Sequence, residues 1–313
     1  MIAIAIALWA ALAIALAFIY YVRYVEPMRI GLTRVEVPLE GLPEALENLT
    51  IAHLSDFHLR PTRTSERICR QAIEVASRTD ADLVVITGDL TDGYDLLDLC
   101  VARLVGLSAP LGVWAVLGNH DDYCYGESVV RAPEPPTEDE RRAALGSVGI
   151  RLLVNETTLL GVGDVVVALV GVGDISAGRD DLPRALEGAK ASDLVILLSH
   201  SPDILDEPEV EAADLVLCGH THGGQLTLPG IGSPWAPVWR DRRRSAGLMR
   251  AGRQMCYVTR GVASATQARF RCAPEVALLV LRRGAPEGVR AVPVRRGTLR
   301  VEPEVAAAEE VIS

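Results

Sequence analysis

The sequence lacks an excess of basic residues, and it lacks the glycine-rich loops of nucleotide-binding folds. With 31 Lys and Arg against 41 Asp and Glu, the formal net charge is −10. A general binder of nucleic acid needs a basic stripe that replaces the counterions of the phosphates, so we expect no nucleic-acid partner. Neither a P-loop nor a GxGxxG motif is present. An acidic protein that handles phosphates needs local help, such as bound metal cations.

Closely spaced cysteine pairs are also missing. The six cysteines are Cys69, Cys100, Cys124, Cys218, Cys256 and Cys272. A zinc ribbon or a disulfide scaffold needs pairs such as CxxC, and none occurs. We therefore expect free, mostly buried thiols, which favour a reducing compartment.

Charge is absent from residues 2–22, unlike the rest of the chain. A helix over this stretch spans about 31 Å, which is close to one hydrocarbon core. Tyr20, Tyr21 and Tyr24 lie where an interfacial aromatic belt would be. A cleaved signal peptide is the alternative, but no Lys or Arg precedes the apolar run and bulky residues end it. We predict a retained transmembrane anchor over residues 1–22.

The charges beside this span predict its orientation. Arg23, Arg29 and Arg34 all follow it, and Glu26 reduces the bias. Loops rich in Lys and Arg tend to stay on the cytoplasmic side of a membrane. We therefore predict a single-pass protein of the cell membrane with the C-terminal bulk in the cytoplasm.

The rest of the chain alternates between strand and helix patterns. Residues 23–47 carry Pro and Gly and predict an edge hairpin or ordered linker. Within residues 48–294, short apolar runs separated by helical patterns predict an α/β domain with a parallel, buried sheet. Residues 151–174 have the pattern of a strand, a turn and a second strand, which predicts an antiparallel pair of strands. Residues 295–313 lack core residues, and we expect a mobile tail.

Polar residues follow five of the predicted strands. They are Asp56, His58, Asp89, Asn119, His120, His200, His220 and His222. Because the carboxyl ends of parallel strands share one edge of a sheet and ligands bind there, we expect these side chains to lie together. The sixth histidine, His53, lies inside a strand and predicts a hydrogen-bonded core residue.

Asp, Asn and neutral imidazole are oxygen and nitrogen ligands that suit Mn, Fe, Zn or Co. Seven such ligands, with His120 left aside, are too many for one ion with an open position. The pattern therefore predicts two divalent metal ions with one carboxylate bridging them. A scatter of polar cap residues serving other chemistry is the alternative.

Five motifs carry a family resemblance. DFH (56–58), GDL (88–90), GNHD (118–121), SH (199–200) and GHTH (219–222) resemble, in this order, the signature of the calcineurin-like metallophosphoesterase superfamily. GGQ (223–225), VTRGV (258–262) and PEVALL (274–279) resemble its membrane-associated bacterial branch, which includes small phosphodiesterases and a UDP-2,3-diacylglucosamine hydrolase of lipid A synthesis. The resemblance implies a four-layer αββα sandwich, and hydrolysis of a phosphoester or pyrophosphate by direct attack of a metal-bridging hydroxide.

The same resemblance implies roles for individual residues. It assigns one metal to Asp56, His58, Asp89 and His222, and the other to Asp89, Asn119, His200 and His220. His120 faces the substrate in the family, where it stabilises phosphoryl charge or protonates the leaving oxygen. Asp121 would either orient the ring of His120 or cap a helix. Arg260 would be a phosphate clamp or a surface charge.

His220 and His222 lie one residue apart in the last motif. Side chains alternate in an extended segment, so we expect both rings to face the site while Thr221 points away. The neighbouring glycines allow the tight backbone path that keeps both rings near the ions.

One stretch bears on the substrate. Residues 233–248 place Trp235 and Trp239 among Arg240, Arg242, Arg243 and Arg244. Trp beside Arg suits a lipid headgroup interface, and an exposed basic loop with packed tryptophans is the alternative. We expect a lipid-linked, phosphate-containing substrate, with UDP-2,3-diacylglucosamine as the most specific candidate. A general envelope phosphodiesterase and a catalytically weak metal-binding or scaffold protein are the alternatives.

Overall fold

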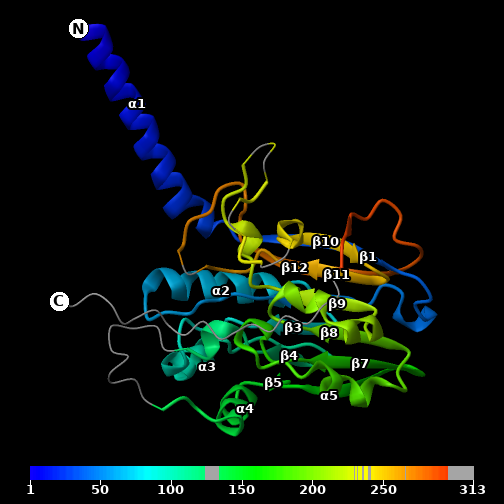
Figure 1. Cartoon of the computed structure of the whole chain (residues 1–313). Helices are drawn as coiled ribbons and strands as arrows, with labels where there is room; N and C mark the ends of the chain where they lie inside the picture. Colours follow the sequence, from blue (N-terminus) through cyan, green and yellow to red (C-terminus); the bar gives the residue numbers. More distant parts are fainter. Residues whose placement is uncertain are drawn as a thin grey trace, which may run out of the picture.

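Two β-sheets lie face to face in the body of the protein, and one long helix projects away from them (Figure 1). The computed structural model describes residues 1–123, 134–228, 230, 232–234, 236–238, 241–264 and 266–294. The segment predicted as a mobile tail, 295–313, lies outside the described residues.

The first sheet has six strands. Its order is β1 (Gly31–Leu39), β12 (Glu275–Arg283), β2 (Thr50–Leu54), β3 (Leu83–Thr87), β4 (Val113–Val116) and β5 (Ile150–Leu152). Strands β2 to β5 run parallel, as the sequence predicts, and β12 runs antiparallel to β2. Helices α2 (Arg63–Ser77), α3 (Leu97–Arg103) and α4 (Glu138–Gly146) pack on its outer face. Helix α2 begins at the cap Thr62, whose hydroxyl accepts a hydrogen bond from the amide of Ser65.

The second sheet has seven strands. Its order is β13 (Ala291–Val292), β10 (Gly247–Ala251), β11 (Gln254–Val258), β9 (Leu215–Cys218), β8 (Leu194–Leu198), β7 (Val165–Gly171) and β6 (Glu156–Val162). Strands β6 and β7 form the predicted antiparallel pair, while β7, β8, β9 and β11 run parallel. The outer face is covered by α5 (Leu182–Ala185) and by short 3-10 helices such as η9 (Pro202–Asp206) and η10 (Pro208–Ala212).

Alternating side chains divide the core into layers. Ile51 and Val85 of the first sheet pack against residues of the second, such as Ile196 and Leu217, whereas Val84 faces the helices. This alternation follows from the two-residue period of a strand, and the central strands β3, β4, β8, β9 and β11 are buried on both faces. The layers are helix, sheet, sheet and helix, so the predicted αββα sandwich is confirmed.

Within residues 23–47, predicted as an edge hairpin or an ordered linker, β1 is an edge strand of the first sheet with short helical turns before and after it. Strand β1 pairs in parallel with β12, from Gly31 opposite Glu275 to Leu39 opposite Arg283. The partner of β1 comes from the far end of the domain, which no local pattern could reveal.

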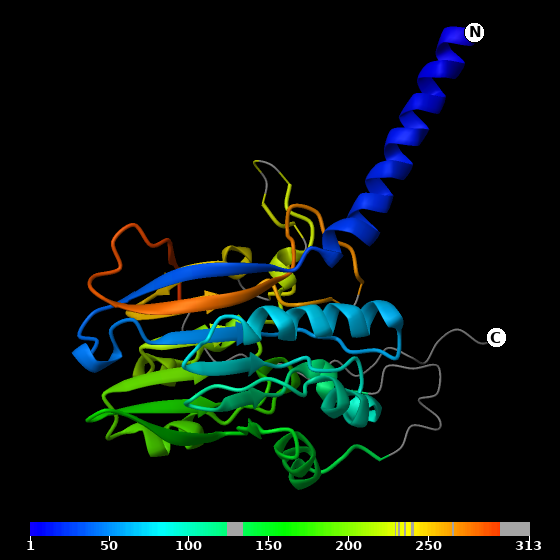
Figure 2. The same ribbon diagram turned by 180° about the vertical axis from the view of Figure 1, so that it is seen from behind.

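Helix α1 (Ile2–Tyr20) buries none of its residues against the body. With the turns that follow, it forms one helical run over Ile2–Met28 that is long and apolar enough to cross a membrane. The figures show it standing clear of the sandwich (Figures 1 and 2).

Candidate metal centre

Most of the polar residues predicted at the strand ends gather where the carboxyl ends of the two sheets meet. Their ligand atoms form three overlapping groups, Asp56–His58–His222, His58–Asp89–His120 and Asp89–His200–His220, each within 4.8 Å. His58 and Asp89 belong to two groups each. Asn119 follows β4 after Leu117 and Gly118, and its side-chain oxygen is buried.

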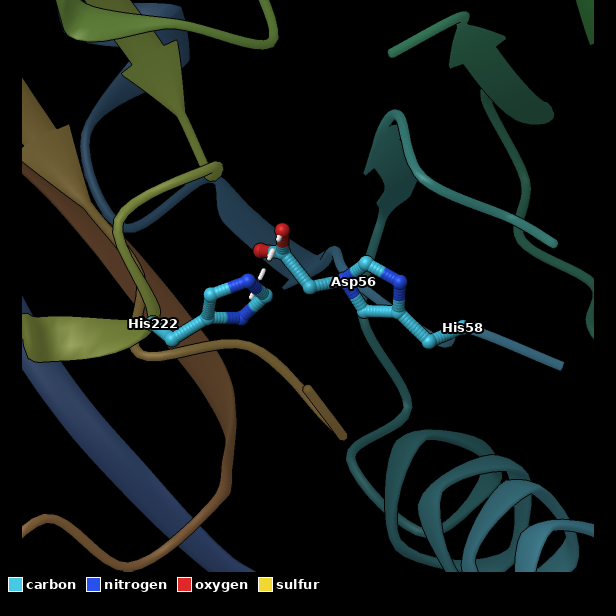
Figure 3. A group of neighbouring side chains, drawn as sticks. All are labelled: Asp56, His58 and His222. Atoms are coloured by element: carbon cyan, nitrogen blue, oxygen red, sulfur yellow. Dashed lines mark ion pairs between the residues drawn. The ribbon is translucent and has the colours of Figure 1, made fainter. Parts of the chain in front are cut away.

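The first group joins the two sheets. Asp56 and His58 follow β2, and His222 comes from the loop after β9 (Figure 3). The Nδ1 atom of His222 lies 3.8 Å from Oδ1 of Asp56, and the rings of His58 and His222 are 5.0 Å apart. The amide of His220 also donates to both oxygens of Asp56, at 3.1 and 3.2 Å.

Asp89 lies between the two remaining groups. Its Oδ2 atom is 3.4 Å from Nε2 of His58 and 3.2 Å from Nε2 of His200. Its Oδ1 atom accepts a hydrogen bond of 2.9 Å from the amide of His120. Burial alone would raise the pKa of Asp89, but the neighbouring His200 and His58 hold it well below its usual value. An ionised carboxylate that faces two imidazole nitrogens is suited to bridge two cations.

The ring orientations of His58 and His200 fit metal binding. Nδ1 of His58 lies 2.7 Å from Oδ1 of Asp92, and Nδ1 of His200 lies 2.7 Å from the carbonyl oxygen of Thr87. Because both neighbours are acceptors, each Nδ1 is the donor in these contacts, and each Nε2 is the atom that faces Asp89 and could bind a metal.

Buried polar atoms without partners support the same fit. In the described part of the chain, Nε2 of His58, Nδ1 of His222 and Oδ1 of Asn119 are buried and have no hydrogen-bond partner. Leaving such atoms unpaired is costly, and a bound cation removes that cost. Burial lowers the pKa of His220 to about 3 and that of His222 well below its usual value, so both rings are neutral, as ligands must be. The residues present therefore fit divalent metals.

The backbone at this site is strained. Positive φ angles occur at Asp56 (57°), His58 (42°), Asp89 (51°), His220 (68°) and His222 (50°). A left-handed conformation costs a residue other than glycine about 1–2 kcal/mol, and such residues cluster at functional sites. The packing of the two sheets must hold these conformations in place.

The prediction of an extended segment at 219–222 is wrong. Thr221 is helical (φ −81°, ψ −17°), and a 3-10 turn, η11 (His222–Gly224), begins directly after it. The left-handed backbone, and not strand alternation, turns both rings inward. Nδ1 of His220 lies 3.1 Å from Nε2 of His200, whereas His222 faces Asp56. The hydroxyl of Thr221 donates to the carbonyl oxygen of Ser245 at 2.6 Å, away from the rings.

Two glycines allow the close approach of these segments. A Cβ atom on Gly219 would lie 1.9 Å from Oγ of Ser55 and 2.7 Å from Oδ2 of Asp56. A Cβ atom on Gly118 would lie 2.3 Å from Oδ1 of Asp89. Any side chain at either position would push a carboxylate out of place.

Asp121 has the contacts of a cap. Its carboxylate accepts hydrogen bonds from the amides of Gly118 (2.9 Å) and Thr91 (3.0 Å), at the short helix η5 (Asn119–Asp121). The carboxylate beside His120 is that of Asp92, with Oδ1 3.2 Å from Nδ1 of the ring. Sequence reasoning missed Asp92, and its position three residues after Asp89 was the available signal. Burial lowers the pKa of His120, but the hydrogen bond with Asp92 and the charge of Asp89 outweigh burial and raise it.

A second missed carboxylate is Asp174, which follows β7. Burial raises its pKa to about 7, partly opposed by His200. Asp174 also lines a cavity of about 140 Å³, together with Leu117, Asp122, Pro135, Pro136, Glu138, Arg141, Val154, Gly173 and Arg179. Leu117 and Asp122 of this lining flank the segment that carries Asn119 and His120, so the cavity lies near the donor cluster.

Two of the arginines considered for substrate contact form ion pairs within the protein. Arg260 is half-buried, and its guanidinium pairs with Glu275 and donates to the hydroxyl of Thr33 at 3.1 Å. A role of Arg260 in holding a phosphate stays a prediction. Arg244 is fully buried in a two-bond ion pair with Asp206, at 2.8 and 3.0 Å, and cannot face a headgroup.

The remaining predictions concern the Trp- and Arg-rich stretch, the cysteines and His53. Trp235, Trp239 and Arg240 lie outside the described residues, and so does Cys124. The other five cysteines are free and buried, as expected. His53 is a core residue, as predicted, with Nε2 2.8 Å from Oγ1 of Thr87.

Comparison with known proteins gives a family match and several relatives. The model of the family described as calcineurin-like phosphoesterase matches residues 49–224. The chain is 33% identical to phosphodiesterase YaeI of Escherichia coli (strain K12) over 271 residues, covering 83% of this chain and 92% of that protein. It is 25% identical to UDP-2,3-diacylglucosamine pyrophosphatase LpxG of Chlamydia muridarum (strain MoPn / Nigg), covering 83% and 91%. A transmembrane protein with metallophosphoesterase domain from Bos taurus is 32% identical, covering 63% of this chain and 45% of that protein.

Proposed function

The chain belongs to the calcineurin-like phosphoesterase family and is a phosphoester hydrolase, and from this premise we propose that it works with two divalent metal ions. The ligands in this proposal are Asp56, His58, Asp89, Asn119, His200, His220 and His222. The observation that carries it is the position of Asp89, whose Oδ2 atom faces Nε2 of both His58 and His200. The metals are Mn, Fe or Zn, given the mixed oxygen and nitrogen donors.

Divalent metals at such a site supply polarisation of a phosphate and activation of water. The chain's own residues supply orientation and a proton. Asp92 fixes the rings of His58 and His120. The raised pKa of His120 favours its protonated form, which can donate a proton to a phosphoryl oxygen or to the leaving oxygen. Asp121 acts on His120 only through the cap that it provides for η5.

We further propose that α1 is a retained anchor and that the substrate is a lipid-linked phosphate. The exposed, apolar surface of α1 supports the anchor, and the name of the bovine relative agrees with it. The name of the chlamydial relative favours a nucleotide-linked lipid such as UDP-2,3-diacylglucosamine. Arginines after the span favour a cytoplasmic catalytic domain.

A second candidate is hydrolysis of a phosphodiester of the envelope. It is favoured by the higher identity to a protein named a phosphodiesterase. The two candidates differ in the bond that is cleaved, since one is a pyrophosphate and the other a diester.

The test uses the full-length protein in detergent with added Mn²⁺. Hydrolysis is measured on UDP-2,3-diacylglucosamine, on a phospholipid diester and on a small chromogenic diester. His120→Ala is compared with wild type, with metal content measured on both. We expect two metals in each protein and loss of turnover in the variant, largest for poor leaving groups. One metal or none in active wild-type protein would overturn the two-metal proposal, and loss of metal from His120→Ala would overturn the role of His120.

A further inference from the structure

The chain directly after the membrane helix is built into the body of the protein. Residues 21–28, here called the foot, form a π-helical turn (Tyr21–Val25) and a 3-10 turn (Glu26–Met28). The side chain of Glu26 is only 4% exposed, whereas all of α1 is exposed. Glutamate is seldom buried to this extent without a partner, so the burial of Glu26 calls for a structural reason.

The partner of the foot is the segment 266–272, here called the brace. The amide of Arg269 donates to the carbonyl oxygen of Val22 at 2.9 Å. Arg23 donates to the carbonyl oxygen of Thr266 at 3.1 Å. The carboxylate of Glu26 accepts a hydrogen bond of 2.6 Å from the amide of Cys272. Three hydrogen bonds therefore join the foot to the brace, and both views show the two segments side by side (Figures 1 and 2).

The brace in turn holds the loop that carries His222. The amide of Phe270 donates to the carbonyl oxygen of Gln225, and the amide of Thr227 donates to that of Phe270, both at 2.9 Å. The thiol of Cys272 donates to the carbonyl oxygen of His222 itself at 3.2 Å. A Cβ atom on Gly223 would lie 2.5 Å from this sulfur, so the brace and the loop are in close contact.

We propose that Glu26 is a positioning residue for the metal centre, acting through Cys272 on the backbone of His222. The inference rests on the proposed role of His222 as a metal ligand. The left-handed conformation of His222 costs about 1–2 kcal/mol by itself, so neighbouring contacts must hold it. Glu26 fixes the amide of Cys272, and Cys272 fixes the carbonyl of His222. Because only the turn Tyr21–Val25 separates Glu26 from α1, this chain of contacts also places the His222 loop near the bilayer surface.

Full-length protein in detergent tests the proposal with three variants. Glu26→Ala removes the acceptor, Glu26→Gln keeps an acceptor oxygen, and Glu40→Ala changes an exposed glutamate in the turn after β1. The first readout is the affinity of the metal-free protein for Mn²⁺, measured by calorimetry. The second is the rate at which a thiol reagent labels Cys272 in the metal-free protein, measured by mass spectrometry.

We expect Glu26→Ala to weaken Mn²⁺ binding by about 10- to 100-fold, as for other contacts that orient a ligand. It should also speed the labelling of Cys272, which is 2% exposed in the intact protein. Glu26→Gln and Glu40→Ala should match wild type in both readouts. Wild-type affinity together with a protected Cys272 in Glu26→Ala would overturn the proposal.

A further variant covers the case in which Glu26→Ala does not fold. Cys272→Ala leaves the foot unchanged and removes only the thiol contact with His222, so it should weaken Mn²⁺ binding to a similar extent. Wild-type affinity in Cys272→Ala would overturn the link to His222. If wild-type protein itself binds no metal, the proposed function fails, while faster labelling of Cys272 in Glu26→Ala would still show that the foot holds the brace.

Discussion

Nδ1 of His58 lies 2.7 Å from Oδ1 of Asp92, a carboxylate that belongs to none of the five sequence motifs. Burial would raise the pKa of Asp92, but hydrogen bonds with His120 and His58 hold it below its usual value. The ionised group thus fixes one proposed ligand and the proposed proton donor together.

Asp92→Ala should therefore impair both metal binding and turnover. We expect a loss of about 10- to 100-fold in Mn²⁺ affinity, the usual effect of removing a partner that orients a ligand. Asp98→Asn, an exposed position on α3, is the matched control. Unchanged affinity and turnover in Asp92→Ala would remove Asp92 from the site.

Asp89→Asn should be the most damaging single change at the metal centre. It replaces the carboxylate that faces His58 and His200 by a neutral amide. We expect turnover to fall by at least about 10³-fold, which corresponds to about 4 kcal/mol of activation free energy. Elemental analysis of the purified variant should show less than two metals per chain. A variant that keeps two metals and most of its activity would contradict a bridging role.

Gly219→Ala should disrupt the site although it replaces none of the proposed ligand residues. The new methyl group would overlap Oγ of Ser55 and Oδ2 of Asp56. A displacement of about 1 Å at a reacting centre typically costs about 100-fold in rate, and we expect a loss of that size. Gly161→Ala, whose Cβ would meet nothing within 4 Å, should be neutral. Equal activities of the two variants would show that close approach at Gly219 is unimportant.

Deletion of residues 2–20 should separate the role of α1 as a membrane anchor from the role of the foot in supporting the body. None of these residues is buried in the body, and the foot stays in place, so hydrolysis of a small soluble diester should be unchanged. Hydrolysis of a bilayer-embedded substrate should fall, because the site is no longer held at the membrane. Loss of both activities would mean that α1 supports the fold.

A reporter fused after residue 313 measures the orientation of the full-length protein. We expect reporter activity in the cytoplasm, because the arginines follow the span. A reporter active only outside the cytoplasmic membrane would reverse the topology and favour an envelope phosphodiester as substrate.

His53 should make stability depend on pH. Burial lowers its pKa from 6.5 to about 3. Between these values the unfolded chain binds a proton that the folded protein does not, so stability falls as pH drops below 6.5. For one such group the loss is about 1.4 kcal/mol between about pH 7.5 and pH 5.5. Denaturant unfolding of metal-free protein at these two pH values should give the free energy of unfolding. Its decrease from the higher to the lower pH should be smaller in His53→Gln by this amount. Identical slopes in the two proteins would mean that His53 is not held neutral.

The sequence by itself determined the strands and the polar residues at their ends. Short apolar runs identified β2, β3, β4, β8 and β9, because a strand buried on both faces has a continuous apolar pattern. Asp56, Asp89 and His200 each follow such a run within two residues. The shared edge of the first sheet accounts for Asp56 and Asp89, whereas His200 follows β8 of the second sheet and meets them because the two sheets pack face to face. Local patterning and topology rules need no knowledge of distant contacts.

Only the tertiary structure decided how these residues are supported. Asp92 meets His58 across 34 residues of sequence, and Glu26 meets Cys272 across 246. Arg244 also pairs with Asp206 across 38 residues of sequence, and strand β1 pairs in parallel with β12 from the far end of the domain. The left-handed backbone of His222 is unfavourable locally and exists because distant segments hold it. Such contacts depend on which surfaces meet when the sheets pack, and neither periodicity nor spacing in one segment carries that information.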